Sequence, residues 1–138
     1  MKSQYCSIEF LPGLGASDRN LLNAQGIENT QELLQRTKTQ AAKVDLASRL
    51  KLHQKHLSKW IALADLARIP SVGTQYCGLL LHAGIISVAQ LAQTPFQRLH
   101  RQVSRLQVAT VRRQDLIPPV TQVKQWVEQA QVLSNRSL

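Results

Sequence analysis

The feature that most constrains the fold is an internal repeat, because residues 68–85 restate the pattern of residues 10–27. In each copy a proline-containing turn ends at a glycine, an apolar helical segment follows, and a Gly-Ile step closes the unit. The aligned positions that keep their chemistry are Pro12 and Pro70, Leu14 and Val72, Gly15 and Gly73, Leu22 and Leu80, Gly26 and Gly84, and Ile27 and Ile85. A unit that occurs twice restricts the chain to folds built from two similar halves.

Each copy predicts two short helices joined at the Gly-Ile step. In the first copy, Gly15 permits a tight turn, and Ser17 or Asp18 can cap the helix that follows. Gly26 is free to take a positive φ and ends that helix. Thr30 is then expected to cap the second helix. The second copy repeats these signals with Gly73, Thr74, Gly84 and Ser87.

The remaining segments also favour helices. One apolar stripe at helical spacing consists of Leu57, Trp60, Ile61 and Ala64, and a second runs from Val120 to Leu133 after two prolines. No segment alternates as a strand does. We therefore expect an all-α fold of eight to ten helices, with two pseudo-repeated halves sharing one compact core, residues 1–67 forming the first half and residues 68–138 the second.

These residues resemble the helix-hairpin-helix module. Leu11–Gly15 fits its turn pattern fully, whereas Ile69–Gly73 has Ser71 in place of the first glycine. With Trp60–Ile69, Val111–Arg113 and Trp126–Ala130 included, nearly the whole chain is similar to an uncharacterised bacterial family of tandem helix-hairpin-helix proteins. That resemblance implies a fold and no established activity.

The resemblance also implies a way of binding phosphate. In nucleic-acid-binding helix-hairpin-helix proteins, backbone N–H groups of the turn and of the helix start face a phosphate. The matching positions here are Gly13, Gly15, Ala16 and Ser17 in the first copy, and Val72, Gly73, Thr74 and Gln75 in the second. The alternative is that both turns are scaffold, with the glycines serving only to form tight turns.

Two departures from the DNA-binding pattern affect this expectation. The cation that such proteins often have two residues after the second glycine is replaced by the neutral Ser17 and Gln75. Glu9 and Asp18 place negative charge beside the first turn, which Arg19 offsets only if it points outward. On the sequence alone, the second turn is therefore the better candidate for phosphate.

The formal charge of +9 is unevenly distributed. Residues 8–34 have one basic and four acidic residues, a net charge of −3, whereas residues 35–67 have seven basic and two acidic residues, a net charge of +5. Basic residues recur at helical spacing in two rows, Lys51, Lys55 and Lys59, and then Arg98, Arg101 and Arg105 with Arg112 and Arg113 beyond. Such rows can follow a nucleic-acid backbone or an acidic protein surface, or they are solvated faces.

Signals of catalysis or metal binding are missing from the sequence. No phosphate-binding GK[ST] loop occurs, and the histidines form no metal-binding pair. We expect no catalytic residue, metal, cofactor or small-molecule substrate. Cys6 and Cys77, far apart and outside any CxxC motif, are expected to be reduced structural thiols. Trp60 and Trp126 lie in apolar stripes, which favours core packing over ligand stacking.

The chain has no apolar run long enough for a bilayer, and its first residues do not form a secretion signal, so we expect a cytoplasmic protein.

Two functions remain open. The first function is a small non-enzymatic protein that binds nucleic acid without sequence preference. The second is an interaction module or assembly factor that docks on an acidic protein complex or membrane surface. The sequence leaves the oligomeric state open.

Overall fold

The computed structural model describes residues 2–110 and 117–136, and these ranges contain helices and no β-strand. A 3-10 turn, η1 (Ile8–Phe10), precedes eight α-helices. They are α1 (Ala16–Ala24), α2 (Thr30–Gln35), α3 (Gln40–Leu50), α4 (Gln54–Ala67), α5 (Gly73–His82), α6 (Val88–Ala92), α7 (Phe96–Thr110) and α8 (Val120–Arg136). The predicted all-α fold and helix number are confirmed for the described residues.

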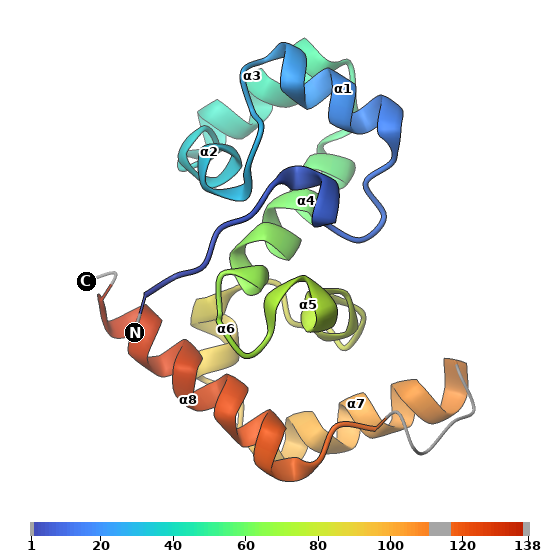
Figure 1. The fold of residues 1–138 in the computed structure, drawn as a ribbon, viewed down its shortest axis with the longest axis vertical. Coiled ribbons are helices and arrows are strands. Elements are labelled where there is room, and N and C mark those ends of the chain that lie inside the picture. The colour runs from blue at the N-terminus through green and yellow to red at the C-terminus, as the bar shows by residue number, and fades with distance from the viewer. Residues whose placement is uncertain (1, 111–116, 137–138) are drawn as a thin grey trace.

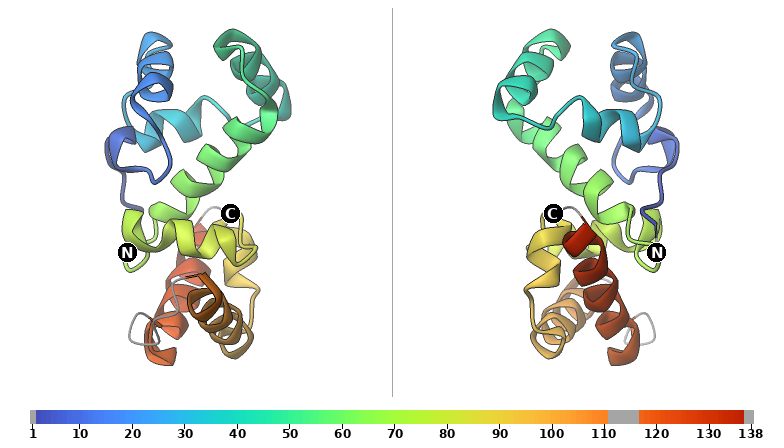
Figure 2. Two further views of the ribbon diagram at one scale, coloured as in Figure 1. Left: turned by 90° about the vertical axis from the view of Figure 1, so that its right-hand side faces the viewer. Right: turned by 90° about the vertical axis from the view of Figure 1, so that its left-hand side faces the viewer.

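Helix α4 connects the two ends of an elongated molecule (Figures 1 and 2). It packs against α2 and α3 in the upper part of Figure 1 and against α5 in the lower part, where α8 packs on α6 and α7. One hydrophobic cluster runs through the molecule from Ile8 to Leu133. Trp60 and Trp126 belong to this cluster and are 4% and 0% exposed, so both are core residues as predicted.

The segment before η1 ties the first helices to the end of α4. The backbone N–H of Gln4 donates to the carbonyl of Arg68 at 2.8 Å, and the N–H of Thr30 donates to the carbonyl of Cys6 at 2.8 Å. The Thr30 hydroxyl accepts from the N–H of Cys6 at 3.1 Å. The prediction that Thr30 caps α2 is wrong, because its hydroxyl is used in this contact and Asn29 is the cap.

The two glycine turns differ in conformation. The Gly-Ile steps end α1 and α5 as predicted, with φ values of 81° and 95° at their glycines. Before those helices, however, a positive φ occurs at Gly13 in the first turn (79°) and at Gly73 in the second (54°). Gly15 is extended, so its predicted role in the tight turn is wrong. Ser71 replaces the first glycine of the second turn, and there the left-handed conformation occurs at Gly73 instead.

Candidate functional site

Among helices α1 to α6, two begin without a capping side chain. The N-cap side chains of α2, α3, α4 and α6 each accept a backbone N–H of their own helix, and these residues are Asn29, Thr39, His53 and Ser87. Helices α1 and α5 instead start after Gly15 and Val72 with no such hydrogen bond. The first N–H groups of a helix have no partner within it. Of the helices from α1 to α6, therefore, the two that follow glycine turns have first N–H groups that no N-cap side chain binds.

The first glycine turn, residues 11–15, opens to solvent. The positions predicted to contact phosphate at this turn, Gly13, Gly15, Ala16 and Ser17, are all exposed. The ammonium nitrogen of Lys59 lies 3.8 Å from the position that a Cβ on Gly13 would take. A cation from α4 therefore stands beside a turn whose own sequence lacks one.

The acidic residues near this turn are partly neutralised. Arg19 pairs with Glu9 at 3.6 Å, and both side chains remain accessible to solvent. Asp18 is the acidic residue in the first turn of α1. Because the Arg19 guanidinium group offsets the charge of Glu9, less negative charge opposes an anion here than the sequence indicates.

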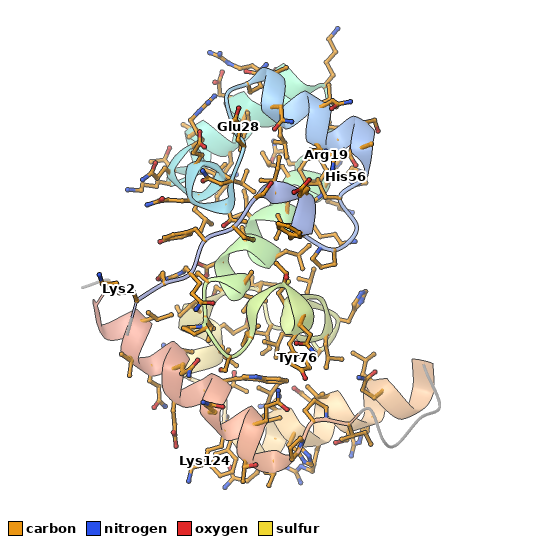
Figure 3. All side chains as sticks on the ribbon, in the orientation of Figure 1. Lys2, Arg19, Glu28, His56, Tyr76 and Lys124 are labelled. Carbon is orange, nitrogen blue, oxygen red and sulfur yellow. The ribbon has the colours of Figure 1, made fainter. Side chains whose placement is uncertain are left out.

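The second glycine turn, residues 69–73, is covered by α8. The Gln129 carbonyl oxygen Oε1 accepts from the Ser71 N–H at 2.9 Å and from its hydroxyl at 2.7 Å. The Trp126 indole N–H donates to the Ser71 carbonyl at 3.2 Å. Tyr76, on the side of α5 that faces α8 in Figure 3, has its ring 5.1 Å from that of Trp126. Of the predicted phosphate donors here, Val72 is 2% exposed, Gly73 and Thr74 are half-buried, and Gln75 is exposed.

The two basic rows lie on different parts of the molecule. Lys51, Lys55 and Lys59 are exposed at the end of α3 and along the first turns of α4, in the upper part of the molecule where His56 is labelled in Figure 3. The exposed residues Arg98, Arg101 and Arg105 belong to α7, at the lower end of Figure 1. Arg112 and Arg113 lie outside the described residues.

Helix α5 lies between the first glycine turn and α7. The ring of Pro12 is 3.5 Å from the position of a Cβ on Gly78 in α5, and α5 also contacts α7. The lysine row is therefore the one that the structure brings to the first turn.

A groove that sequence reasoning missed borders the lysine row. This α4 groove has a volume of about 540 Å³ and is bounded by residues of α2, α3, α4 and α5 and by the segment before α6. Its apolar lining consists of Leu34, Ile61, Ala62, Leu81 and Ile86, and its basic lining of Lys43, Lys55 and Lys59. The repeat contains one signal for it: Ile86 aligns with Glu28 of the first copy, so an apolar residue occupies a position that is exposed in both copies.

The two thiols are protonated at neutral pH. Burial raises the pKa of the Cys77 thiol to about 11 and raises that of Cys6 as well. Neither forms a disulfide. Within residues 2–110 and 117–136, no group of three His, Cys, Asp or Glu side chains is placed to hold a metal ion. In the same ranges, no helix combines the length and the apolar character needed to cross a membrane.

Comparison with known proteins gives one match. The family described as Domain of unknown function (DUF4332) matches residues 12–133. No curated protein and no solved structure matches the chain. The expected similarity to a family without an established activity is thus confirmed. The function is therefore inferred from the geometry and charge of the site.

Proposed function

The chain belongs to the DUF4332 family, a family of unknown function, and we propose that it is a small non-enzymatic protein that binds nucleic acid at the first glycine turn. One observation carries the proposal: the Lys59 ammonium group stands beside Gly13, at an exposed turn whose following helix has no side-chain cap. Free N–H groups at a helix start, together with a nearby cation, suit a phosphate group. Because phosphate contacts do not distinguish bases, the proposed binding has no sequence preference.

We propose further that α1–α2 and α5–α6 are two helix-hairpin-helix units with different roles. Both pairs follow a glycine turn, start without a side-chain cap and join through Gly-Ile. The first unit would contact phosphate, because its turn is exposed beside Lys59. The second would be scaffold, because Gln129 and Trp126 of α8 already hold its turn. This assignment reverses the order of preference that the sequence alone suggested.

The proposed contact surface continues from Lys59 along the lysine row. Lys55 lies one helical turn before Lys59 on α4, and Lys51 is the C-cap of α3 in the short connection that leads into α4. Three lysines that neutralise about three phosphates predict a slope of about −3 for log K against log salt concentration. The arginines of α7 are outside the proposed surface, since α5 lies between them and the turn.

The test is a fluorescence anisotropy titration of the full chain with labelled duplex DNA, single-stranded DNA and RNA of several sequences. At low salt we expect binding that varies little with base sequence. Lys59→Ala should weaken binding about fivefold and reduce the salt slope by about 1. Arg101→Ala removes another exposed cation, from α7, and should change affinity less than twofold. No binding of any probe at about 100 µM protein, or equal losses in the two variants, contradicts the proposal.

Ser17 provides a second test, because substitutions there change stability and binding in opposite directions. Ser17 is exposed in the first turn of α1. Asp at this position favours the helix start by about 0.5 kcal/mol and places a negative charge at the proposed phosphate. Ser17→Asp should therefore raise the free energy of unfolding and weaken binding, whereas Ser17→Lys should do the reverse. A Ser17→Asp variant that binds as tightly as the parent protein contradicts phosphate contact at this turn.

A further inference from the structure

The α4 groove combines an aliphatic floor with a basic rim. Ile61 and Ala62 of α4 and Leu81 of α5 contribute to the floor, and Lys43, Lys55 and Lys59 come from α3 and α4. No aromatic side chain is among the residues described as lining it. Stacking of bases needs aromatic faces, so the groove does not suit unpaired bases.

The one carboxylate in the groove is neutralised within the protein. Asp65 Oδ1 accepts from the Arg68 Nε–H at 2.8 Å, and Asp65 Oδ2 accepts from the backbone N–H of Val88 at 2.8 Å. Because both oxygens already have partners, the three lysines dominate the charge that an incoming group meets. The groove is therefore complementary to a negatively charged ligand.

Ile86 at the edge of the groove is the most exposed large hydrophobic residue in the described part of the chain, at 61%. It follows the buried Ile85, whereas the first copy has the exposed Glu28 at the same place after Ile27. The turn itself therefore accepts a polar residue at this position. Exposing an isoleucine to water is unfavourable, and a ligand with apolar groups would cover it.

We infer that the α4 groove binds an acidic amphipathic segment of a partner protein. Aliphatic side chains of that segment lie on the groove floor and against Ile86, and its carboxylates lie against Lys43, Lys55 and Lys59. Laying an apolar face into a groove is a common mode of peptide recognition, and charge complementarity selects an acidic peptide. This site lies beyond the proposed nucleic-acid contact, with which it shares Lys55 and Lys59.

The experiment is selection of a random peptide display library against the full chain, followed by anisotropy titration of the enriched peptides as labelled synthetic probes. The enriched peptides should be net negative and contain aliphatic residues at helical spacing. Ile86→Asp should weaken their binding at least tenfold. Val120→Asp replaces another exposed aliphatic residue, 42% exposed at the start of α8, and should leave binding within twofold. Circular dichroism checks that both variants keep the helical content of the parent.

Lys43 separates this site from the first glycine turn. Lys43→Glu should weaken the acidic peptides and restore affinity for a peptide in which one Glu is changed to Lys. Three results overturn the inference: no enriched peptide, enriched peptides that are neutral or basic, or peptide binding that Ile86→Asp leaves intact. It is also overturned if Ile86→Asp weakens nucleic-acid binding as strongly as Lys59→Ala does, because the groove would then belong to the nucleic-acid surface. If Lys59→Ala weakens nucleic-acid binding and Ile86→Asp does not, the inference about the α4 groove stands.

Discussion

Gln129 of α8 accepts two hydrogen bonds from Ser71, from the backbone N–H at 2.9 Å and from the hydroxyl at 2.7 Å. Ser71 occupies the position at which the first turn has Gly13. A glycine there would lack the hydroxyl, so this serine allows the second turn to bind α8 through two groups. The same contact removes a backbone donor from the set available to a ligand.

Gln129→Ala should lower the free energy of unfolding by about 1–2 kcal/mol, because the N–H of Ser71 loses its partner in a partly buried site. Urea denaturation measures this loss. Gln125→Ala, at an exposed position of the same helix, should change stability by less than about 0.5 kcal/mol. An equal loss in both variants would show that the contact with Ser71 does not contribute to the free energy of unfolding beyond the effect of an exposed glutamine.

Gly13→Ala and Gly78→Ala should have effects of opposite sign. Gly13 has φ 79°, where a Cβ is strained, so the alanine should cost about 1–2 kcal/mol. Gly78 is inside α5, and its Cβ would meet Pro12 at an ordinary contact distance of 3.5 Å. Helix propensity should then stabilise the protein by about 0.5–1 kcal/mol. Thermal unfolding of the two variants checks both signs, and destabilisation by Gly78→Ala would disprove the packing described for Pro12.

The stability of the protein should depend more on the oxygen atoms of Asp65 than on its charge. Asp65→Ala removes the acceptors of the Val88 N–H and of Arg68 and should cost about 2–3 kcal/mol. Asp65→Asn keeps an acceptor oxygen for the Val88 N–H and should cost about half as much. Chemical denaturation of the two variants distinguishes these outcomes, and equal losses would indicate that the ion pair with Arg68 provides most of the stabilisation.

Stability should fall at alkaline pH through Cys77. Burial raises the pKa of this thiol from 9.0 to about 11 in the folded protein, so between these values the unfolded chain has lost a proton that the folded chain retains. The contribution is fully present below pH 9 and declines by about 2 kcal/mol as the pH approaches 11. Urea denaturation at pH 8 and pH 10.5 should show a smaller decline for Cys77→Ala than for the parent, since lysine titration affects both proteins equally. Identical declines would contradict the raised pKa.

Local patterns in the sequence were sufficient for much of the fold. The Gly-Ile steps end α1 and α5, Ser87 caps α6, and both tryptophans are buried, because each signal depends on residues within one or two helical turns. The first residue of the apolar stripe in α8, Val120, is nevertheless 42% exposed. Periodicity predicts which face of a helix a residue occupies. It does not predict how far a neighbouring helix extends along that face and covers the residue.

The sequence by itself determined that the chain is all-α and where its glycine turns lie, since backbone conformation is a local property. The predicted lysine row holds for Lys55 and Lys59 on α4, whereas Lys51 is the left-handed C-cap of α3 and does not share their helix. Only the tertiary structure decided which turn is open. The second turn is covered by Gln129, which is distant in sequence, and the first acquires its cation from Lys59 on another helix. Contacts between segments distant along the chain depend on how the helices pack, and neither periodicity nor composition specifies that packing.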